Sequence, residues 1–536
     1  MKKLKLVCVA IAMAGAAPTF AGGLLTNTNQ HVAFNRMMSR EASIGIDGVY
    51  YNPAGVVFMG EGHHLAINWQ LAYQTRTINN DYKLFTNNVN NPITPRDFKG
   101  KAFAPVIPSF QYAYNKGKWS FQANFSLTGG GGKCTFDDGL GSFEKIVSET
   151  AIAACGLAGV VDKTLGNKLG QPGMEMFTSD QAFGKTGKYS FNSYMHGRQY
   201  YYGLSAGAAY KFCDNFSAFL GVRGVYALTN YYGYVENINV GNMPLYKVLD
   251  PTKENAANIE LSCDQTGVGF TPIIGVDYKT GRWNFSAKYE FKTRIRLKNK
   301  SVNQTPSIGN LPANLANQMT GILTARYQQA GLPLEQAKQQ AENTTNAVLN
   351  DPTVGATMMG LKTQFDQKLN KAIGEYEDGK KIAGDIPGYL ALGIGYSPVD
   401  AVRVNVGFHW FDDKNATSYN NRNKELKRGT LEYNAGVEVD VNKKITLSTG
   451  WQNTNYGLSD EYMDDKSFVV SSNSAAIGGV YHINKKMDLN VAYFHTFYQH
   501  KKTSETVQLA ADKSIVYNSD YTRNNNVFAV GLDINF

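Results

Sequence analysis

The stretch LEYNAGVEVDVNKKITLSTGW, residues 431 to 451, has the alternating pattern of two strands joined by a polar turn. One face carries apolar side chains and the other polar ones: Leu431, Tyr433, Ala435, Val437 and Val439 against Glu432, Asn434, Gly436, Glu438 and Asp440. After the turn, Ile445, Leu447, Thr449 and Trp451 continue the apolar face. A sheet face of this kind needs an apolar partner, and the rest of the chain indicates which one.

The same period of two returns in segment after segment, which is typical of strands with two unlike faces. Fourteen such segments are predicted: 64–78, 103–114, 118–128, 200–212, 215–228, 265–279, 282–297, 386–397, 401–412, 428–440, 444–454, 472–483, 487–500 and 525–536. Tight polar turns, such as Thr280-Gly281 and Asn442-Lys443, alternate with much longer links. Short and long connections therefore lie at opposite ends of the predicted sheet.

The N-terminus indicates export from the cytoplasm. Lys2, Lys3 and Lys5 precede an apolar run from Leu6 to Ala17, and small residues follow, so we expect a signal peptide over 1–21 that is cleaved after Ala21. No later stretch has the roughly 20 apolar residues that a transmembrane helix needs. The net charge of +9 includes these three lysines, and the small, dispersed excess that remains argues against a nucleic-acid partner.

Cysteine spacing does not indicate a metal site. Cys8 lies within the signal run, and Cys134, Cys155, Cys213 and Cys263 lack CxxC spacing, so we expect no metal and no other cofactor. In an exported protein, a disulfide from Cys134 to Cys155 and free, buried thiols are both open readings.

These features together predict an all-β transmembrane barrel of fourteen antiparallel strands in a bacterial outer membrane. Hydrocarbon chains would be the partner of the apolar face, and the first and last strands must pair, because an open sheet edge in lipid leaves backbone groups without hydrogen bonds. Only 43% of the residues are hydrophobic, which also argues against a large dry core. A soluble β-sandwich would not explain fourteen strands that share one turn asymmetry. We expect a monomer.

Two kinds of segment lie outside the strand pattern. Residues 22–62 lack alternation but are too apolar for a solvated tail, so we expect a plug, or hatch, inside the barrel formed by residues 63–536. The long loops 129–199 and 298–385 carry helical patterns, with Leu361, Phe365, Leu369 and Ile373 at intervals of four in the second. Their apolar stripes have two readings, which are packing between loops and a hydrophobic groove at the outer mouth.

Gly129, Gly130, Gly131 and Gly132 follow the third segment, where glycine weakens a strand and often marks a bulge or kink. A kink there would interrupt pairing and open a side window toward lipid. A plain flexible exit into the loop is the other reading.

Over essentially the full mature chain, the sequence resembles the FadL-like family of outer-membrane transporters for long-chain fatty acids and other hydrophobic compounds. The specific match is Asn52-Pro53-Ala54 within SIGIDGVYYNPAG, supported by the glycine run and by DIPGYLALGIGYSP at 385–398. The resemblance implies an N-terminal hatch carrying Asn52, Pro53 and Ala54 beside a kink in the third strand, and sideways release of an apolar ligand into the membrane. The tetraglycine stands where many members have a Pro-Phe-Gly type stretch.

Strand parity predicts which side chains face the lumen. Among them, Tyr201, Phe219, Phe494 and Tyr498 are aromatic, and Arg223, Lys288 and Arg403 are cations that a ligand carboxylate would favour. The alternative for these cations is pairing with lumen carboxylates such as Glu290, Glu432, Glu438 and Asp440.

Two other functions remain open from the sequence. A barrel protease or phospholipase would need a nucleophile beside a histidine, and His409, His482 and His495 lie on separate strands. A general porin, or a barrel that binds a partner through its long loops, is the second.

Overall fold

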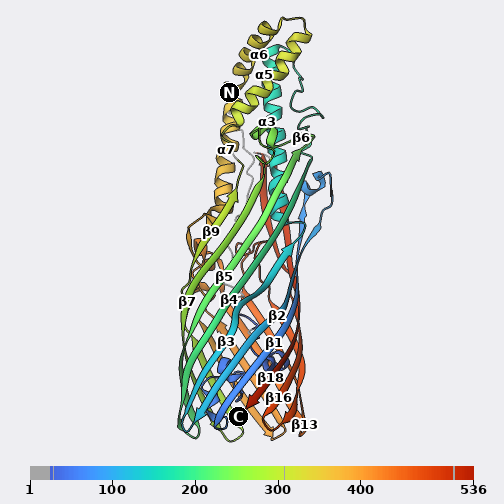
Figure 1. Cartoon of the computed structure of the whole chain (residues 1–536). Coiled ribbons are helices and arrows are strands. Elements are labelled where there is room, and N and C mark those ends of the chain that lie inside the picture. Colours follow the sequence, from blue (N-terminus) through green and yellow to red (C-terminus); the bar gives the residue numbers. More distant parts are fainter. Residues whose placement is uncertain (1–24, 28, 307, 511–512) are drawn as a thin grey trace.

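The computed structural model describes residues 25–27, 29–306, 308–510 and 513–536. The expected signal peptide and its cleavage site lie outside the described residues. Strands tilt around a long barrel, and helices stand on its upper end (Figure 1). No helix within the described residues is long and apolar enough to cross a bilayer.

Fourteen strand paths form the wall, as predicted. The sheet contains eighteen strands, of which β6 (Met243–Pro244) is a short hairpin partner, while β9, β10 and β17 continue the paths of β8, β11 and β16. β1 pairs with β18 from His64 opposite Asn535 to Tyr82 opposite Tyr517, so the sheet is closed. The wall strands are β1 (Gly62–Tyr82), β2 (Arg96–Lys116), β3 (Trp119–Phe136), β4 (Tyr189–Cys213), β5 (Phe216–Val240), β7 (Ile259–Thr280), β8 (Trp283–Glu290) with β9 (Arg296–Gln304), β10 (Lys381–Ala383) with β11 (Tyr389–Val399), β12 (Val402–Phe411), β13 (Arg428–Asn442), β14 (Ile445–Gly457), β15 (Ser472–Asn484), β16 (Met487–Tyr498) with β17 (Lys501–Ala510), and β18 (Lys513–Asn535).

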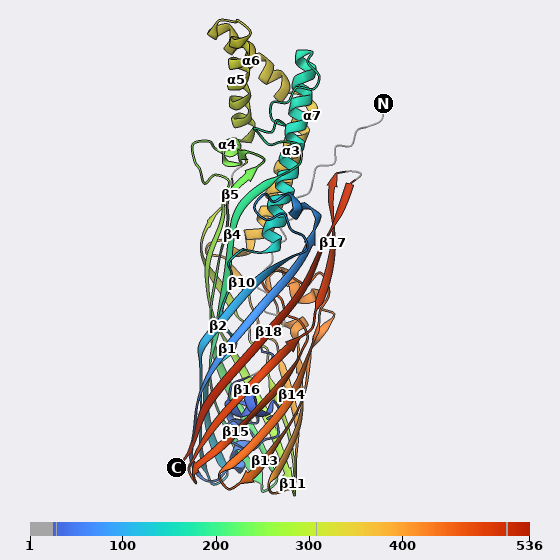
Figure 2. The same cartoon turned by 90° about the vertical axis from the view of Figure 1, so that its right-hand side faces the viewer.

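Side chains alternate across the wall as the opening stretch predicts. In β13 and β14, Tyr433, Leu447 and Trp451 are exposed outward, whereas Glu432 and Glu438 are buried inside. Outward apolar side chains cover the lower part of the barrel wall on all sides, which is the arrangement that surrounding lipid stabilises. The short turns and the C-terminus lie at the lower end, and this end is periplasmic in barrels of this type (Figure 2).

Several strands are longer than the alternation predicts. β4 begins at Tyr189 instead of residue 200, β5 runs to Val240 instead of 228, and β18 begins at Lys513 instead of 525. Above the lipid-facing band, outward positions such as His196 and Arg198 are polar, so the apolar alternation fades although backbone pairing continues. Parts of the predicted loops 129–199 and 298–385 are therefore wall.

Helices form the structure above the barrel. They are α3 (Gly141–Leu169), α4 (Tyr246–Leu249), α5 (Leu311–Gln329), α6 (Leu334–Leu349) and α7 (Pro352–Ile373). α3 and α7 fall in the two insertions where helical patterns are predicted. Cys134, Cys155, Cys213 and Cys263 are all free thiols, so the bridge from Cys134 to Cys155, one of the two open readings, is not formed.

Candidate functional site

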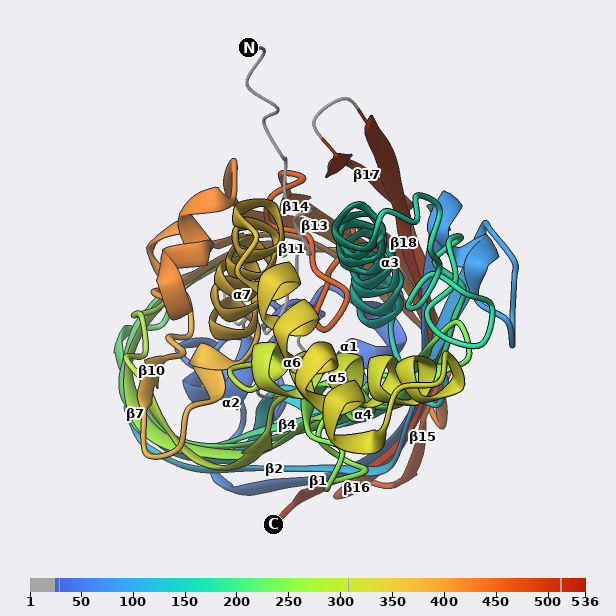
Figure 3. The same ribbon diagram turned by 90° about the horizontal axis from the view of Figure 1, so that it is seen from above.

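The N-terminal segment lies inside the lower half of the barrel, where α1 (Val32–Met37), α2 (Gly48–Tyr51) and the 3-10 helix η1 (Gly55–Phe58) fill the lumen (Figure 3). We call residues 25–60 the hatch. Its backbone approaches the wall closely, because a Cβ at Gly436 or Gly450 would collide with the carbonyl oxygen of Met37. The glycines on the polar face of the opening stretch are thus the places where the wall makes room for the hatch.

Buried ion pairs hold the hatch to β13. Glu438 accepts hydrogen bonds from the guanidinium groups of Arg36 and Arg40, the latter at 3.1 Å, and Arg40 also pairs with Asp47 at 2.7 Å. The side chains of Glu438 and Arg36 are both almost fully buried. Such pairs contribute little net stability but are expensive to break, so they fix one position of the hatch.

A second cluster joins the hatch to the wall through a histidine. The Nε2 atom of His409 lies 2.7 Å from Glu41 of the hatch, and its Nδ1 atom lies 2.9 Å from Glu432 of β13. All three side chains are buried. A protonated imidazole satisfies both carboxylates at once, so His409 serves here as a link between hatch and wall.

The Asn-Pro-Ala motif is docked on the opposite wall. Asn52 donates to Asp277 of β7 at 2.6 Å, Gln122 of β3 donates to the Pro53 carbonyl at 2.7 Å, and Ser217 of β5 donates to the Ala54 carbonyl at 2.7 Å. This placement differs from the expected one beside the glycine run. Gln122 lies seven positions before Gly129, the first glycine of the run, which is about 23 Å along a strand.

The predicted kink region contains a break in the barrel wall. β2 and β3 pair from Phe110 opposite Phe125 downward and from Ala102 opposite Cys134 upward, but residues 103–109 and 126–133 form no ladder between them. On the other edge of β3, the register with β4 shifts twice, first between Leu127 and Gly129 and again between Gly130 and Gly132. β3 therefore follows β4 and leaves β2 over this length.

Both sides of the break are built from residues that disfavour pairing. On β3, Gly130 has φ of +77° and a Cβ there would collide with the carbonyl of Gln199. On β2, Pro105 and Pro108 have no backbone N–H to donate. The two prolines are a signal that the sequence contained and that the sequence analysis did not use.

A different part of the hatch lies at the break. Gln30 donates to the carbonyl of Leu127 at 2.7 Å, and its own carbonyl accepts from Ser109 at 2.7 Å and from Gln111 at 3.0 Å. Gln30 thus bridges β2 and β3 at the lower end of the break through hydrogen bonds of its side chain and its backbone carbonyl. The segment before α1, rather than the Asn-Pro-Ala motif, contacts the opening.

A lumen cavity of about 250 Å³ lies behind the break and above the hatch. Its lining combines the hatch start, the break and the opposite wall, and includes Leu25, Gln30, Gly129, Gly130, Gly132, Phe494 and Tyr498. Phe494 and Tyr498 thus line the same cavity as the glycine run, whereas Arg223, Lys288 and Arg403 are not among the lining residues of this cavity. Tyr201 is fully buried and Phe219 packs against Ala54 and Val57 of the hatch, and neither lines this cavity.

The three predicted cations are matched by carboxylates. Arg223 makes a bidentate pair with Glu290 at 2.6 and 2.9 Å, and Lys288 lies 2.9 Å from the same carboxylate and donates to the Tyr50 carbonyl. Arg403 pairs with Asp440 at 2.6 and 2.8 Å. The alternative of pairing with lumen carboxylates is the one that the contacts support for each.

Two other arginines face the cavity and have no anionic partner within the part of the chain that the structure describes. Arg76 of β1 and Arg523 of β18 are direct cross-strand partners, and both line the cavity. Among the described residues, Arg76 is bonded through Nε to Gln74 at 2.9 Å, and the guanidinium of Arg523 lies 4.9 Å from the Phe468 ring while its buried Nε has no hydrogen-bond partner. Like charges directly opposite each other destabilise a sheet, and an anion bound between the two guanidinium groups would relieve that repulsion.

Parity could have found Arg76, because it lies on the polar face of the first predicted strand. Arg523 precedes the predicted start of the last strand at 525. Because that predicted strand was too short, strand parity was not applied to Arg523. Cross-strand adjacency of the two is a property of barrel closure and has no local signal in the sequence.

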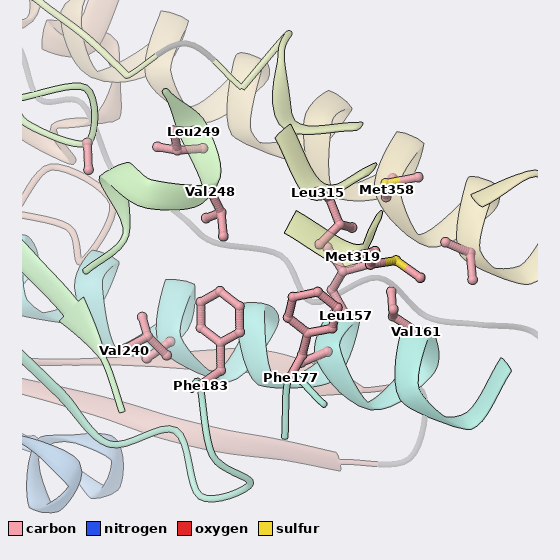
Figure 4. Close-up of a cluster of buried hydrophobic side chains, with 14 of the residues drawn as sticks. Leu157, Val161, Phe177, Phe183, Val240, Val248, Leu249, Leu315, Met319 and Met358 are labelled. Atoms are coloured by element: carbon pink, nitrogen blue, oxygen red, sulfur yellow. The ribbon is translucent and has the colours of Figure 1, made fainter. Parts of the chain in front are cut away.

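The outer helices enclose an apolar groove of about 130 Å³. α3, α4, α5 and α7 contribute to it, and Leu157, Leu249 and Leu315 are among its lining residues (Figure 4). Leu361 and Phe365 of the predicted stripe on α7 line the same groove. The apolar stripes therefore pack between loops and also leave a small groove at the outer mouth. Both interpretations of the stripes apply to part of them.

One buried carboxyl group, at the upper ends of β12 and β13, has a raised pKa. Asp413, in the 3-10 helix η4 (Asp413–Asn415), accepts a hydrogen bond from the Thr430 amide at 2.8 Å and is almost fully buried. Burial, together with the nearby charges of Asp412 and Glu432, raises the pKa of Asp413 to about 7.

The described residues contain no cluster of three or more His, Cys, Asp or Glu side chains that could hold a metal ion.

Neither a protein-family model nor a curated protein sequence matches this chain. Among solved structures, a Pseudomonas aeruginosa FadL homologue superposes with a TM-score of 0.57 at 13% identity, covering 96% of this chain and 100% of its own. The deltaS2S3 mutant of the monoaromatic hydrocarbon channel TodX gives 0.50 at 12% identity, with 94% and 98% covered. The Ralstonia pickettii toluene transporter TbuX gives 0.47 at 14% identity, with 98% and 99% covered. The chain shares the fold of a FadL homologue over nearly its whole length.

Proposed function

We propose that this protein transports long-chain fatty acids, or similar amphiphiles with one anionic group, across the outer membrane. A ligand is captured in the apolar groove between α3 and α7, enters the cavity above the hatch, and leaves sideways through the break between β2 and β3. The observation that carries the proposal is that break, because residues from both of its edges, Ala104 and Ile107 of β2 and Gly129, Gly130 and Gly132 of β3, line the lumen cavity.

The two unpaired arginines support an anionic headgroup. A carboxylate between Arg76 and Arg523 would relieve their mutual repulsion and form charge-assisted hydrogen bonds. The resemblance to the FadL-like family and the shared fold agree with a hydrophobic ligand. Aromatic hydrocarbons, which the names of the TodX and TbuX structures specify, have no group that would need these cations.

The break can be closed by a reversible covalent link. A Cβ built on Gly132 would lie 3.6 Å from the Cβ of Ala104, which is within the usual range for a disulfide. The double variant A104C/G132C, in a background with Cys134, Cys155 and Cys213 replaced by Ser, therefore joins β2 to β3 across the break.

We expect the oxidised double variant to take up labelled oleate at least about tenfold more slowly than the same protein after reduction. The single variants A104C and G132C are matched controls and should show no response to reductant. Equal uptake by the oxidised and reduced forms, with the disulfide verified by mass spectrometry, would refute sideways release.

A general porin is the second candidate for this fold. The hatch fills the lower lumen and is bonded to β3, β5, β7, β12 and β13, which favours a closed path for ions. Purified protein in planar bilayers should give little steady current, whereas a porin gives a large one.

An enzymatic role is not favoured by the histidine geometry. The Nε2 atom of His482 lies 3.0 Å from the Thr446 hydroxyl and its Nδ1 atom lies 2.7 Å from Asp488, which resembles a nucleophile triad. The Thr446 hydroxyl donates to Asp440 at 2.6 Å, however, so the histidine is not positioned to remove that proton. The contact is part of a polar network at the periplasmic rim.

A further inference from the structure

Four consecutive outward positions on one strand path carry a positive charge. Between β8 and the end of β9 the sequence reads Thr293-Arg-Ile-Arg-Leu-Lys-Asn-Lys300, in which Arg294, Arg296, Lys298 and Lys300 are exposed. The intervening side chains Ile295, Leu297 and Asn299 are buried inside the barrel. Lys381, exposed on β10, is the direct cross-strand partner of Lys298. We call these five residues the cationic column.

The column begins where the lipid-facing band ends. Lower on the same path, Trp283, Phe285 and Phe291 are exposed outward. On the neighbouring β7, Phe270 and Val268 are 69% and 64% exposed, and Thr266, two residues above Val268, is the cross-strand partner of Lys298. Exposed apolar side chains therefore flank the lower end of the column, at the level where acyl chains give way to headgroups.

Four of the five positive charges have no carboxylate partner within the described residues. Arg296 pairs with Asp385 at 2.8 Å, but within the described residues no carboxylate lies within ion-pair distance of Arg294, Lys298, Lys300 or Lys381. Asp264 of β7 is the cross-strand partner of Lys300, yet its side chain accepts from Asn230 instead, at 2.8 Å. Lys298 and Lys381 stand directly opposite each other, an arrangement that is unfavourable unless an anion lies between them.

We propose that the cationic column binds the phosphate groups of lipopolysaccharide in the outer leaflet, with its acyl chains lying against Phe270 and Val268. Arginine and lysine both bind phosphate, arginine through its planar fork and lysine as a point charge. A strand places alternate side chains about 7 Å apart along the wall, so the column offers a row of donors rising from the lipid surface instead of one isolated contact. This surface is outside the lumen and does not depend on the transported ligand.

The test uses the full-length purified barrel and rough lipopolysaccharide labelled with a fluorophore. The variant K298Q/K300Q/K381Q removes three unpaired charges and keeps Arg296 with its partner. The matched control K253Q/K338Q/K362Q also removes three charges, from lysines that are paired with aspartate or glutamate in the structure above the barrel. Thermal unfolding of both variants verifies folding.

We expect the column variant to bind lipopolysaccharide at least about tenfold more weakly than the unmodified protein, and the control to bind within about twofold of it. Dephosphorylated lipopolysaccharide should bind both proteins equally weakly, and millimolar inorganic phosphate should not displace the intact lipid. Unchanged affinity of the column variant would overturn the proposal. An equal loss in the control variant, or an equal loss of binding to phosphatidylglycerol vesicles, would overturn the assignment to the outer-leaflet glycolipid.

Discussion

Replacing Arg523 with glutamine should make the barrel more stable and its binding of fatty acid weaker. Arg523 and Arg76 are cross-strand partners that face one cavity, and neither has a carboxylate partner among the described residues. Two unit charges about 5 to 8 Å apart repel by about 2 to 3 kcal/mol at an effective dielectric constant of about 20. Because both side chains are half-buried and partly screened, we expect R523Q to raise the free energy of unfolding by about 1 kcal/mol.

The same substitution removes a charge-assisted hydrogen bond to the ligand. Such bonds contribute about 1.5 to 3 kcal/mol, which corresponds to a loss of at least about tenfold in affinity for oleate. Oleyl alcohol has the same chain without the negative charge, so its affinity should change by less than about twofold. Displacement of a fluorescent fatty acid from the purified barrel measures both affinities, and urea titration in liposomes measures stability.

R403Q is the matched control because Arg403 also faces the lumen but is paired with Asp440. It should lower the stability and leave the affinity for oleate unchanged. If R523Q lowered the free energy of unfolding and bound oleate as tightly as the unmodified protein, the two arginines would not be a ligand site and the reasoning from their repulsion would be wrong.

Three further outcomes follow from the contacts of the hatch and wall. Glu438→Gln leaves two buried hatch arginines without their shared carboxylate and should lower the free energy of unfolding in urea by about 3 to 5 kcal/mol; a loss below about 1 kcal/mol would contradict the anchoring role. Gly130→Ala should cost at least about 1 to 2 kcal/mol, because its φ is +77° and its Cβ would also collide with the carbonyl of Gln199, whereas Gly132→Ala meets its nearest neighbour at 3.6 Å and should cost less than half of that in the same titration. Because the pKa of Asp413 is raised from 3.8 to about 7, the folded protein holds a proton that the unfolded chain releases between these values, so stability falls as pH rises from about 4 to 7. Melting temperatures of Asp413→Asn should be less dependent on pH over this window, and parallel curves for the two proteins would be evidence against it.

The wall was predictable because its signal is local. Each of the fourteen strand paths carries its own alternation, and a side chain two residues along a strand always returns to the same face. The glycine run likewise marked the break, since both edges of β3 lose regular pairing there. The strand ends were wrong by up to about twelve residues, because outside lipid the outward positions no longer need apolar side chains.

The ligand site was not predictable in the same way. Parity correctly placed Arg223, Lys288 and Arg403 inside the barrel, but it could not show that Glu290 and Asp440 lie within bonding distance of them. It also could not show that Arg76 and Arg523, more than four hundred residues apart, become neighbours when the first strand meets the last.

The sequence by itself determined a closed, lipid-facing barrel with an occupied lumen, since the period of two and the turn lengths are properties of short stretches. Only the tertiary structure decided which cations are neutralised, where the hatch touches the wall, and which charges stay unmatched. The physical reason is that hydrophobic alternation depends on the solvent at each position, whereas an ion pair depends on a distance of a few ångströms between residues that closure of the barrel brings together.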